Sequence, residues 1–313
     1  MRTNILGIIL ILSIITGKAF SQTQLDSLRN WKIKGTANIN LTQGAVSNWT
    51  EGGDNYISAL NILKLSADYK KNKSSWSNSG EFRYGAMLAS DKTKEKGMKL
   101  IKTDDRIDLY STYGQHFFGK WDMTIMFNFK SQFAKGYDYP NDSVVISDFL
   151  SPANIYFALG FQYKEKDFLS VMISPVTSKT TLVANPQVDE TKYGVPKGER
   201  SKREIGMYVK TNYKVTILDN VIMNNKLVLF SNYLEDPQNI DIDYQVDFTM
   251  KVNTFIQASL HMYFVYDDDT DIPVYEYINY KKTKVGTTKG LQFKEMLAIG
   301  FVFTLKNALK KIH

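Results

Sequence analysis

The stretch IDIDYQVDFTMKVNTFIQASLHMYFVY, residues 240–266, contains two runs in which apolar and polar residues alternate. Apolar residues occupy the even positions from Ile240 to Met250, and again from Ile256 to Tyr266. Successive side chains of an extended strand point to opposite faces, so each run predicts a β-strand with one apolar and one polar face. Only a few residues separate the runs, which predicts an antiparallel hairpin.

The same alternation recurs along the chain from Trp31 onward, and it defines twelve segments. At about 10–14 residues each, they are longer than the strands of soluble proteins and close to the length of membrane-spanning strands. The expected strands are 31–42, 55–69, 76–87, 104–116, 121–133, 153–163, 168–176, 204–217, 222–233, 240–252, 255–267 and 292–305.

Short and long connections alternate between these segments, which predicts an up-and-down meander with one elaborated end. A soluble sandwich or lipocalin-like barrel is the alternative. The strand lengths and the strongly polar second face favour a membrane protein instead. Open sheet edges cannot be left in hydrocarbon, so we expect an all-β, transmembrane antiparallel up-and-down β-barrel of about twelve strands. An even strand number places both termini at the end with the short turns, on the periplasmic side.

Aromatic residues gather on the apolar face at the short-turn ends of the expected strands. Aromatic girdles of this kind mark the membrane–water interface of barrels. The expected membrane-interface aromatics are Trp31, Tyr69, Trp76, Trp121, Tyr163 and Tyr213.

The N-terminus has the features of a secretory signal peptide: Arg2, an apolar run from Ile5 to Ile15, and small residues before Ser21. The run is shorter than the ~20 apolar residues of a membrane anchor. We therefore expect export through a cleaved signal peptide to the outer membrane of a bacterial cell. The expected divisions are 1–21 signal peptide, 22–30 short periplasmic lead, 31–305 outer-membrane β-barrel and 306–313 short basic periplasmic tail.

Composition excludes several kinds of chemistry. The 313 residues include no cysteine, which excludes disulfides, thiolate metal sites and cysteine nucleophiles, and there are only three histidines. Lys and Arg number 39 against 32 Asp and Glu, giving a net charge of +7. The basic residues are scattered and many should face the lumen, so nucleic acid is not an expected partner.

Candidate catalytic and metal sites are few. We find no nucleophile elbow, no His-Glu-x-x-His motif and no phosphate-binding loop, so neither an enzyme nor a cofactor is expected. Asp267, Asp268, Asp269 and Asp271 concentrate hard oxygen ligands and are weak calcium candidates, although they lack the ligand spacing and the glycine of a twelve-residue calcium loop. An exposed acidic loop is the favoured interpretation.

Charged residues of both signs occupy the inward positions of the alternating pattern. Mixed signs favour internal salt bridges, and a barrel of this size leaves either a narrow polar channel or a lumen blocked by charged networks and infolded loops. The expected lumen-facing residues are Lys32, Lys34, Glu81, Arg83, Arg106, Asp108, Lys130, Glu204, Lys210, Lys226, Asp241, Asp243, Asp247 and Lys251.

Several local phrases also point to a family. They are Asn48-Trp49-Thr50-Glu51-Gly52-Gly53, Tyr137-Asp138-Tyr139-Pro140-Asn141-Asp142-Ser143, Ser231-Asn232-Tyr233-Leu234, Asp236-Pro237-Gln238-Asn239-Ile240, Tyr266-Asp267-Asp268-Asp269, Ile272-Pro273 and Gln292-Phe293-Lys294-Glu295. Together they resemble a domain-of-unknown-function family of Bacteroidota outer-membrane β-barrel proteins, from about Trp31 to Leu305. The resemblance implies the barrel and its location, and it carries over no catalytic residue.

The function expected from these observations is that of a porin-like cell-envelope barrel, a narrow channel for small polar solutes. The alternative is a non-conducting structural or assembly subunit of a larger outer-membrane complex. A phospholipase-like enzyme is not expected, because it needs a serine and a histidine that both project outward near the outer rim. The expected partners are outer-membrane lipid, the barrel-assembly machinery during biogenesis and envelope proteins.

Overall fold

The computed structural model describes residues 30–44, 56–91, 97–137, 139, 143–270, 272–278 and 281–306. The expected signal peptide, nearly all of the expected lead and tail, and Asp271 lie outside the described residues. Apart from Trp31, the sheet described below belongs to the compact unit Lys32–His313.

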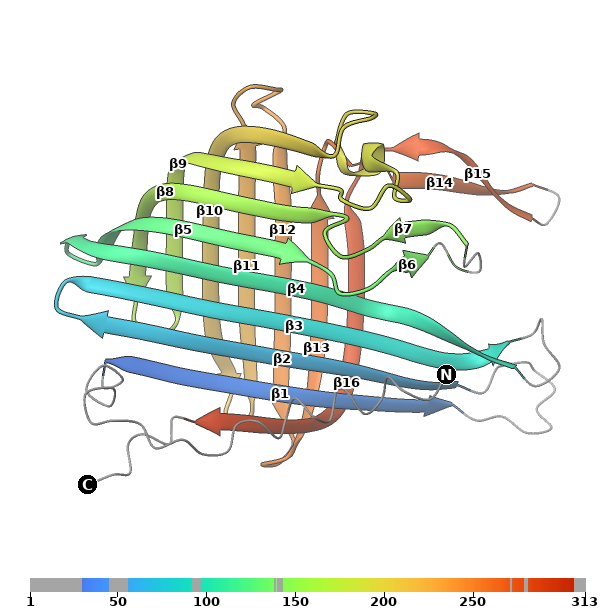
Figure 1. Cartoon of the computed structure of the whole chain (residues 1–313). Coiled ribbons are helices and arrows are strands. Elements are labelled where there is room, and N and C mark those ends of the chain that lie inside the picture. The colour runs from blue at the N-terminus through green and yellow to red at the C-terminus, as the bar shows by residue number, and fades with distance from the viewer. Residues whose placement is uncertain are drawn as a thin grey trace, which may run out of the picture. The chain divides into compact units, whose positions relative to one another are not determined.

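Twelve antiparallel strands form a closed barrel (Figure 1). Each strand pairs with the next barrel strand along the chain, and the last pairs with the first, so the twelve-strand meander expected from the sequence is confirmed. The barrel strands are β1 (Trp31–Gly44), β2 (Tyr56–Lys71), β3 (Ser74–Asp91), β4 (Gly97–Phe118), β5 (Trp121–Ser131), β8 (Ala153–Glu165), β9 (Leu169–Leu182), β10 (Ser201–Leu218), β11 (Val221–Asn232), β12 (Ile240–Lys251), β13 (Ile256–Tyr266) and β16 (Gln292–Lys306).

The long connections contain structure that the alternation did not predict. They hold two hairpins and a 3-10 turn, namely β6 (Gly136–Tyr137) with β7 (Val145–Ser147), β14 (Ile272–Ile278) with β15 (Lys281–Thr288), and η2 (Glu190–Tyr193). A small apolar core of four buried valines, with Tyr137 and Tyr193 packed against it, joins β7 to the loop between β9 and β10. We refer to this barrel end as the loop end.

Tight turns connect the strands at the opposite end, which we call the short-turn end. Asn72, Gly119 and Lys166 adopt left-handed backbone conformations (φ 51°, 57° and 49°) in three of these hairpins. Such values close a short hairpin without splaying its right-twisted strands. In bacterial outer-membrane barrels the short turns face the periplasm and the longer loops face outward.

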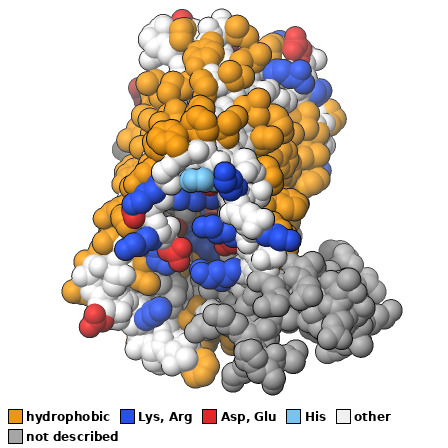
Figure 2. All heavy atoms as spheres, turned by 90° about the vertical axis from the view of Figure 1, so that its left-hand side faces the viewer, with side chains coloured by type: hydrophobic (Ala, Val, Ile, Leu, Met, Phe, Trp, Pro, Cys, Tyr) orange, Lys and Arg blue, Asp and Glu red, His pale blue; other side chains and the backbone are white. Residues whose placement is uncertain are grey.

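The barrel wall is apolar outside and polar over much of its inside. In β5, Phe127 is 41% exposed on the outer surface, whereas Asn128 beside it is 3% exposed. Large apolar side chains cover the outside along the other strands too, and Figure 2 shows them as an orange band around the short-turn end. Such a surface is stable when lipid covers it, so the polarity of the wall is that of a transmembrane barrel. Among the described residues, no helix has the length and hydrophobicity to cross a bilayer.

Bulges bend the wall where β9 pairs with its neighbours. The register shifts after Leu159 in β8 and after Gly206 in β10. A Cβ on Gly206 would stand 1.9 Å from the carbonyl oxygen of Ser231, so only glycine allows this close approach of the two backbones. Inward side chains of adjacent strands meet in register in this part of the wall, such as Tyr208 of β10 and Phe230 of β11.

Candidate functional site

Ion pairs cross the lumen between strands that are not neighbours in the wall. Lys226 Nζ on β11 lies 2.8 Å from Asp108 Oδ2 on β4, and Lys130 Nζ on β5 lies 2.6 Å from Asp243 Oδ2 on β12. Lys64 on β2 lies 3.5 Å from Asp247 on β12, and it also lies 3.5 Å from Glu81 on the neighbouring strand β3. Because most of these contacts join opposite walls, charged side chains cross the lumen. We call these contacts, together with those that Arg83 and Arg106 make with Glu81, Asp104 and Asp108, the ionic belt.

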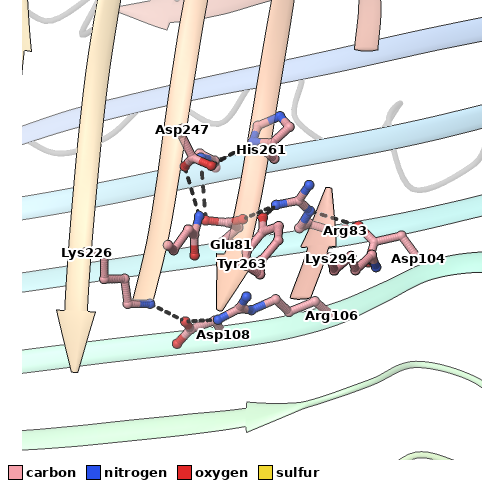
Figure 3. A network of polar contacts seen from close by, with 12 residues as sticks. Glu81, Arg83, Asp104, Arg106, Asp108, Lys226, Asp247, His261, Tyr263 and Lys294 are labelled. Carbon is pink, nitrogen blue, oxygen red and sulfur yellow. Dashed lines mark hydrogen bonds and ion pairs between the residues drawn. The ribbon is translucent and has the colours of Figure 1, made fainter. Parts of the chain in front are cut away.

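Arg83 is the most enclosed member of the ionic belt, with 1% of its surface exposed (Figure 3). Its Nε donates to Asp104 Oδ2 at 3.0 Å, and its Nη1 donates to Glu81 Oε1 at 3.3 Å and to the hydroxyl of Tyr263. Lys294 Nζ reaches the other oxygen of Asp104 at 2.7 Å. The guanidinium of Arg83 therefore ties β3 to β4 and, through Tyr263, to β13.

A histidine–aspartate pair extends the ionic belt toward the short-turn end. His261 Nδ1 lies 2.7 Å from Asp247 Oδ1, and Gln245 Nε2 donates to Asp247 Oδ2 at 2.8 Å. His261 is 4% exposed, and its Nε2 has no hydrogen-bond partner among the described residues. The pair lies within the lumen rather than at the outer rim (Figure 3).

A second charged group lies nearer the loop end. Lys179 Nζ is 2.7 Å from Asp241 Oδ2 and 3.2 Å from Glu204 Oε2. Lys179 and Glu204 are both nearly fully buried. The three side chains connect β9, β10 and β12 across the inner face.

The inner face is not polar throughout. Six residues form a buried apolar cluster under β5 and β8 to β11, with Tyr110 and Tyr156 packed against it. The ring of Tyr156 lies 5.7 Å from that of Tyr208 and 6.2 Å from that of Phe230, measured between centroids. The expectation of a strongly polar inner face is wrong for this sector, because large apolar side chains occupy inward positions. The cluster consists of Met126, Ala158, Met172, Tyr208, Val228 and Phe230.

Among the described residues, two cavities with many charged residues in their lining lie in the lumen. The cavity toward the loop end has a volume of about 410 Å³ and is lined by Arg83, Arg106 and Lys130, among others. The cavity toward the short-turn end has a volume of about 340 Å³ and is lined by residues that include Glu81 and Asp108. The pairs Arg83–Glu81 (3.3 Å) and Arg106–Asp108 (3.4 Å) therefore each join a residue of one cavity to a residue of the other.

The structure places most of the fourteen expected lumen-facing residues in these contacts or cavities. Lys32, Lys34 and Lys251 are exposed residues near strand ends, and Lys34 lines the short-turn cavity. Sequence reasoning missed four charged residues that take part in the contacts: Lys64, Asp104, Lys179 and Lys294. Lys64 and Lys294 occupy inward positions of the alternating pattern, so that pattern contained a usable signal for them.

The three described calcium candidates are engaged in other contacts. Asp268 accepts hydrogen bonds from Asn239 Nδ2 (2.7 Å) and from the hydroxyl of Tyr266 (3.2 Å). Asp269 pairs with Lys202 at 2.9 Å, and Asp267 accepts from the backbone N–H of Asp269. Within the described part of the chain, no group of three or more His, Asp or Glu side chains could hold a metal ion.

The expected interface aromatics lie toward the short-turn end. Tyr69 and Trp76 face each other across the β2–β3 hairpin. Trp121 pairs with Tyr163 across β5 and β8, with ring centroids 5.4 Å apart. Tyr213 is half-exposed beside Phe168, and Trp31 begins β1. This arrangement is compatible with a girdle at one membrane surface.

In the loop between β9 and β10, the side chains of Glu190 and Tyr193 have shifted pKa values. The backbone N–H of Gly198 donates to Glu190 Oε1 at 2.7 Å, which holds the pKa of Glu190 below its usual value. Burial raises the pKa of Tyr193 to about 12, and its hydroxyl donates to the carbonyl oxygen of Ile146 at 2.6 Å. These contacts fasten the loop at both ends of η2.

The model of a family described as "Protein of unknown function (DUF3078)" matches residues 41–137, from β1 to β6. The resemblance to a family of unknown function is thus confirmed for this part of the chain. No curated protein matches the sequence significantly.

Several solved barrels are similar at low scores. The COG4313 outer membrane channel from Pseudomonas putida F1 is 9% identical, with 88% of this chain and 96% of that one covered and a TM-score of 0.37. OmpT, an outer membrane protein of Vibrio cholerae, is 10% identical, with 88% and 97% covered and a TM-score of 0.28. The toluene transporter TodX of P. putida is 8% identical, with 88% of each chain covered and a TM-score of 0.27. These values are too low to indicate a shared function.

Location follows from the architecture of the barrel itself. An even number of antiparallel strands, short turns at one end and an apolar outer band are the features of bacterial outer-membrane barrels. This chain has all three features. It is therefore an outer-membrane β-barrel protein.

Proposed function

We propose that the protein is a narrow channel for small polar solutes, closed at rest by the ionic belt. The observation that supports this proposal is the pair of cavities, one on each side of the contacts Arg83–Glu81 and Arg106–Asp108. Side chains that exchange ion-pair partners or bind water open such a barrier at lower cost than unpacking a strand or an infolded loop. The proposal includes no catalytic step.

Planar-bilayer conductance of the purified protein tests this proposal. The double variant Glu81→Ser with Arg83→Ser removes both members of one pair, while Asp104 keeps Lys294 and Lys64 keeps Asp247. We expect the unit conductance to rise in this variant, because two long side chains no longer fill the lumen. The matched control is Lys120→Ser with Glu165→Ser, an ion pair at the short-turn end, which should leave the conductance unchanged.

The second candidate is a non-conducting structural or assembly subunit of a larger outer-membrane complex. The buried cluster of Met126, Tyr208 and Phe230 with its neighbours favours it, because this sector of the lumen is filled by packed side chains. Absence of conductance in both the wild type and the Glu81→Ser, Arg83→Ser variant, with folding intact, would replace the channel proposal by this one.

A further inference from the structure

The short-turn cavity carries an excess of basic side chains. Four lysines and two carboxylates line it, together with hydroxyl and amide groups such as those of Ser79 and Asn212. Figure 2 looks at this end of the barrel, which is hollowed at its centre and has mainly Lys and Arg side chains around the hollow. The lining charged residues are Lys34, Lys64, Lys210, Lys226, Glu81 and Asp108.

Both carboxylates of the cavity are already neutralised by two cations each. Asp108 Oδ2 lies 2.8 Å from Lys226 Nζ and 3.4 Å from Arg106 Nη2, and its Oδ1 accepts from Asn128 Nδ2 at 2.7 Å. Glu81 contacts Arg83 at 3.3 Å and Lys64 at 3.5 Å. The remaining lysines of the cavity are therefore not balanced by these acids.

Lys210 is the most enclosed of the unbalanced lysines. It is 6% exposed, and its Nζ lies 3.1 Å from the ring centroid of Tyr110. Among the described residues, this lysine forms no ion pair with a carboxylate, and the nearby Asp108 and Asp243 are paired with Lys226 and Lys130. An aromatic ring is a weaker partner for a lysine amine than a carboxylate is, so the amine keeps the capacity to bind an anion, and a bound anion would favour its protonated form.

We propose that the short-turn cavity is a binding site for a small polyvalent anion carrying phosphate or carboxylate groups. Such an anion would accept hydrogen bonds from Lys210 at the inner end and from Lys34 at the exposed mouth, with Ser66 and Ser79 as further donors. The volume of about 340 Å³ is at the lower end of the range of small-molecule sites, which fits an anion of this size. This proposal names a substrate class for the channel proposed above. Any prediction of anion selectivity in conductance therefore rests on the proposed channel function, whereas the prediction of anion binding does not.

Calorimetric titration of the folded full-length protein in zwitterionic detergent, with inorganic pyrophosphate and with citrate as probes, tests the site. Lys210→Met keeps the length of the side chain and removes its charge, and we expect the dissociation constant to rise roughly tenfold, because one charged hydrogen bond is lost. Lys34→Gln, at the exposed mouth, should weaken binding in the same direction and provides a second variant if Lys210→Met does not fold. Lys197→Met, on the exposed loop between β9 and β10, is the matched control and should bind as the wild type does.

Binding must also weaken with added salt, because the attraction is electrostatic. Repeating the titration in nanodiscs with phosphatidylglycerol separates a soluble anion, whose affinity is unchanged, from a lipid phosphate headgroup, which competes. Failure of the wild type to bind either probe, or equal affinities in Lys210→Met and Lys197→Met, would overturn the proposal. If the barrel binds pyrophosphate but does not conduct, the anion site is supported and the channel function is wrong. If the barrel conducts, prefers cations and binds neither probe, the channel function is supported and the anion site is wrong.

Discussion

The apolar cluster on β5 and β8 to β11 packs like a protein core, whereas ion pairs fill the lumen next to β2 to β4, β12, β13 and β16, and Lys130 of β5 and Lys226 of β11 also reach them. In the packed sector Met126 and Ala158 have no exposed surface, and Tyr208 has 1%. In the ion-paired sector Lys64 and Lys226 keep partial exposure and border a cavity. The same wall therefore encloses two kinds of interior.

This difference divides the roles of the lumen. Close-packed apolar side chains leave no space for water and contribute stability through burial. Ion pairs beside a cavity can exchange partners with water or with a solute, and the desolvation cost of the charges offsets much of their attraction. We therefore expect stability to depend mainly on the packed sector, and permeation and selectivity on the ion-paired sector.

The largest expected effect comes from emptying the packed sector. Phe230→Ala removes a ring that is 2% exposed, and it should lower the free energy of unfolding by roughly 3–5 kcal/mol. Denaturant unfolding in lipid vesicles measures this change. The unit conductance should stay at the wild-type value, because the ionic belt is intact.

The control for this variant is Phe303→Ala on β16. Phe303 is 53% exposed on the outer surface, so its truncation leaves no cavity and should cost much less. A conductance in Phe230→Ala as large as in the Glu81→Ser, Arg83→Ser variant would show that the packed sector is the barrier, and the division of roles would be wrong.

The next effect tests which face of the wall meets lipid. Phe248 and Thr249 are neighbours on β12, and Phe248 lies outside while Thr249 lies inside. Arg at the lipid-facing position should cost roughly 2–4 kcal/mol when it lies near the bilayer midplane. Thr249→Arg should be milder, since polar groups of the lumen solvate the guanidinium.

The choice of the inward position matters here. Asn128 and Ser259 also face inward, but they are 3% and 5% exposed, and Asn128 holds Asp108 at 2.7 Å. Arg at either position would clash with the packed interior as well as test the face. If vesicle-folding titrations show Thr249→Arg to be the more damaging of the neighbouring pair, the assignment of faces is reversed.

The alternation in the sequence was sufficient to predict the barrel but not how its interior is filled. The alternation of apolar and polar residues indicates that Phe127 points outward and Asn128 inward, as the structure shows. All twelve barrel strands were predicted from such alternating runs. The same pattern places Lys64 and Lys294 inside. It does not reveal that Lys294 meets Asp104, 190 residues away, because that contact depends on how the closed sheet staggers its strands.

Two misses have distinct physical causes. Lys179 was missed because the expected strand ended at residue 176, whereas β9 continues through a bulge near Val176 to Leu182. Tyr208 and Phe230 occupy inward positions beside outward apolar residues. Because both faces are apolar there, the alternation does not show which residues point inward. The rings meet because Tyr208 and Phe230 are direct partners in the register of β10 and β11, and the alternation alone does not give that register.

A smaller effect is expected within the ionic belt. Lys130 and Asp243 lie 2.6 Å apart with 17% and 22% of their side chains exposed. A double-mutant cycle with Lys130→Met and Asp243→Asn should give a coupling free energy within roughly 0.5–3 kcal/mol. The coupling should shrink at 1 M salt if water and ions reach the pair. A coupling that salt does not change would indicate an interior as closed as the packed sector.

The smallest effect concerns the apolar core at the loop end, a packed region outside the membrane. Tyr193 packs against the valines of this core and donates to the carbonyl oxygen of Ile146. Tyr193→Phe keeps the ring and removes the hydrogen bond, so it should cost only about 0.5–1.5 kcal/mol of loop stability. Protease cleavage between β9 and β10 measures this loss. Tyr233→Phe is the control: its hydroxyl donates to the carbonyl oxygen of Pro175, and the side chain is 48% exposed. This variant should leave the cleavage rate between β9 and β10 unchanged.

The pH dependence of the same loop separates packing from ion pairing. Burial raises the pKa of Tyr193 from 10 to about 12, so the folded loop favours the neutral phenol. Its contribution to stability is complete below pH 10 and is lost as the pH rises through 12. The difference in phenolate absorbance between wild type and Tyr193→Phe should therefore appear near pH 12. In the wild type, the loop should be cleaved faster at this pH than at neutral pH. If the phenol of Tyr193 ionises near pH 10 instead, its ring is exposed to water. The apolar core at the loop end would then be less tightly packed than the apolar cluster in the lumen.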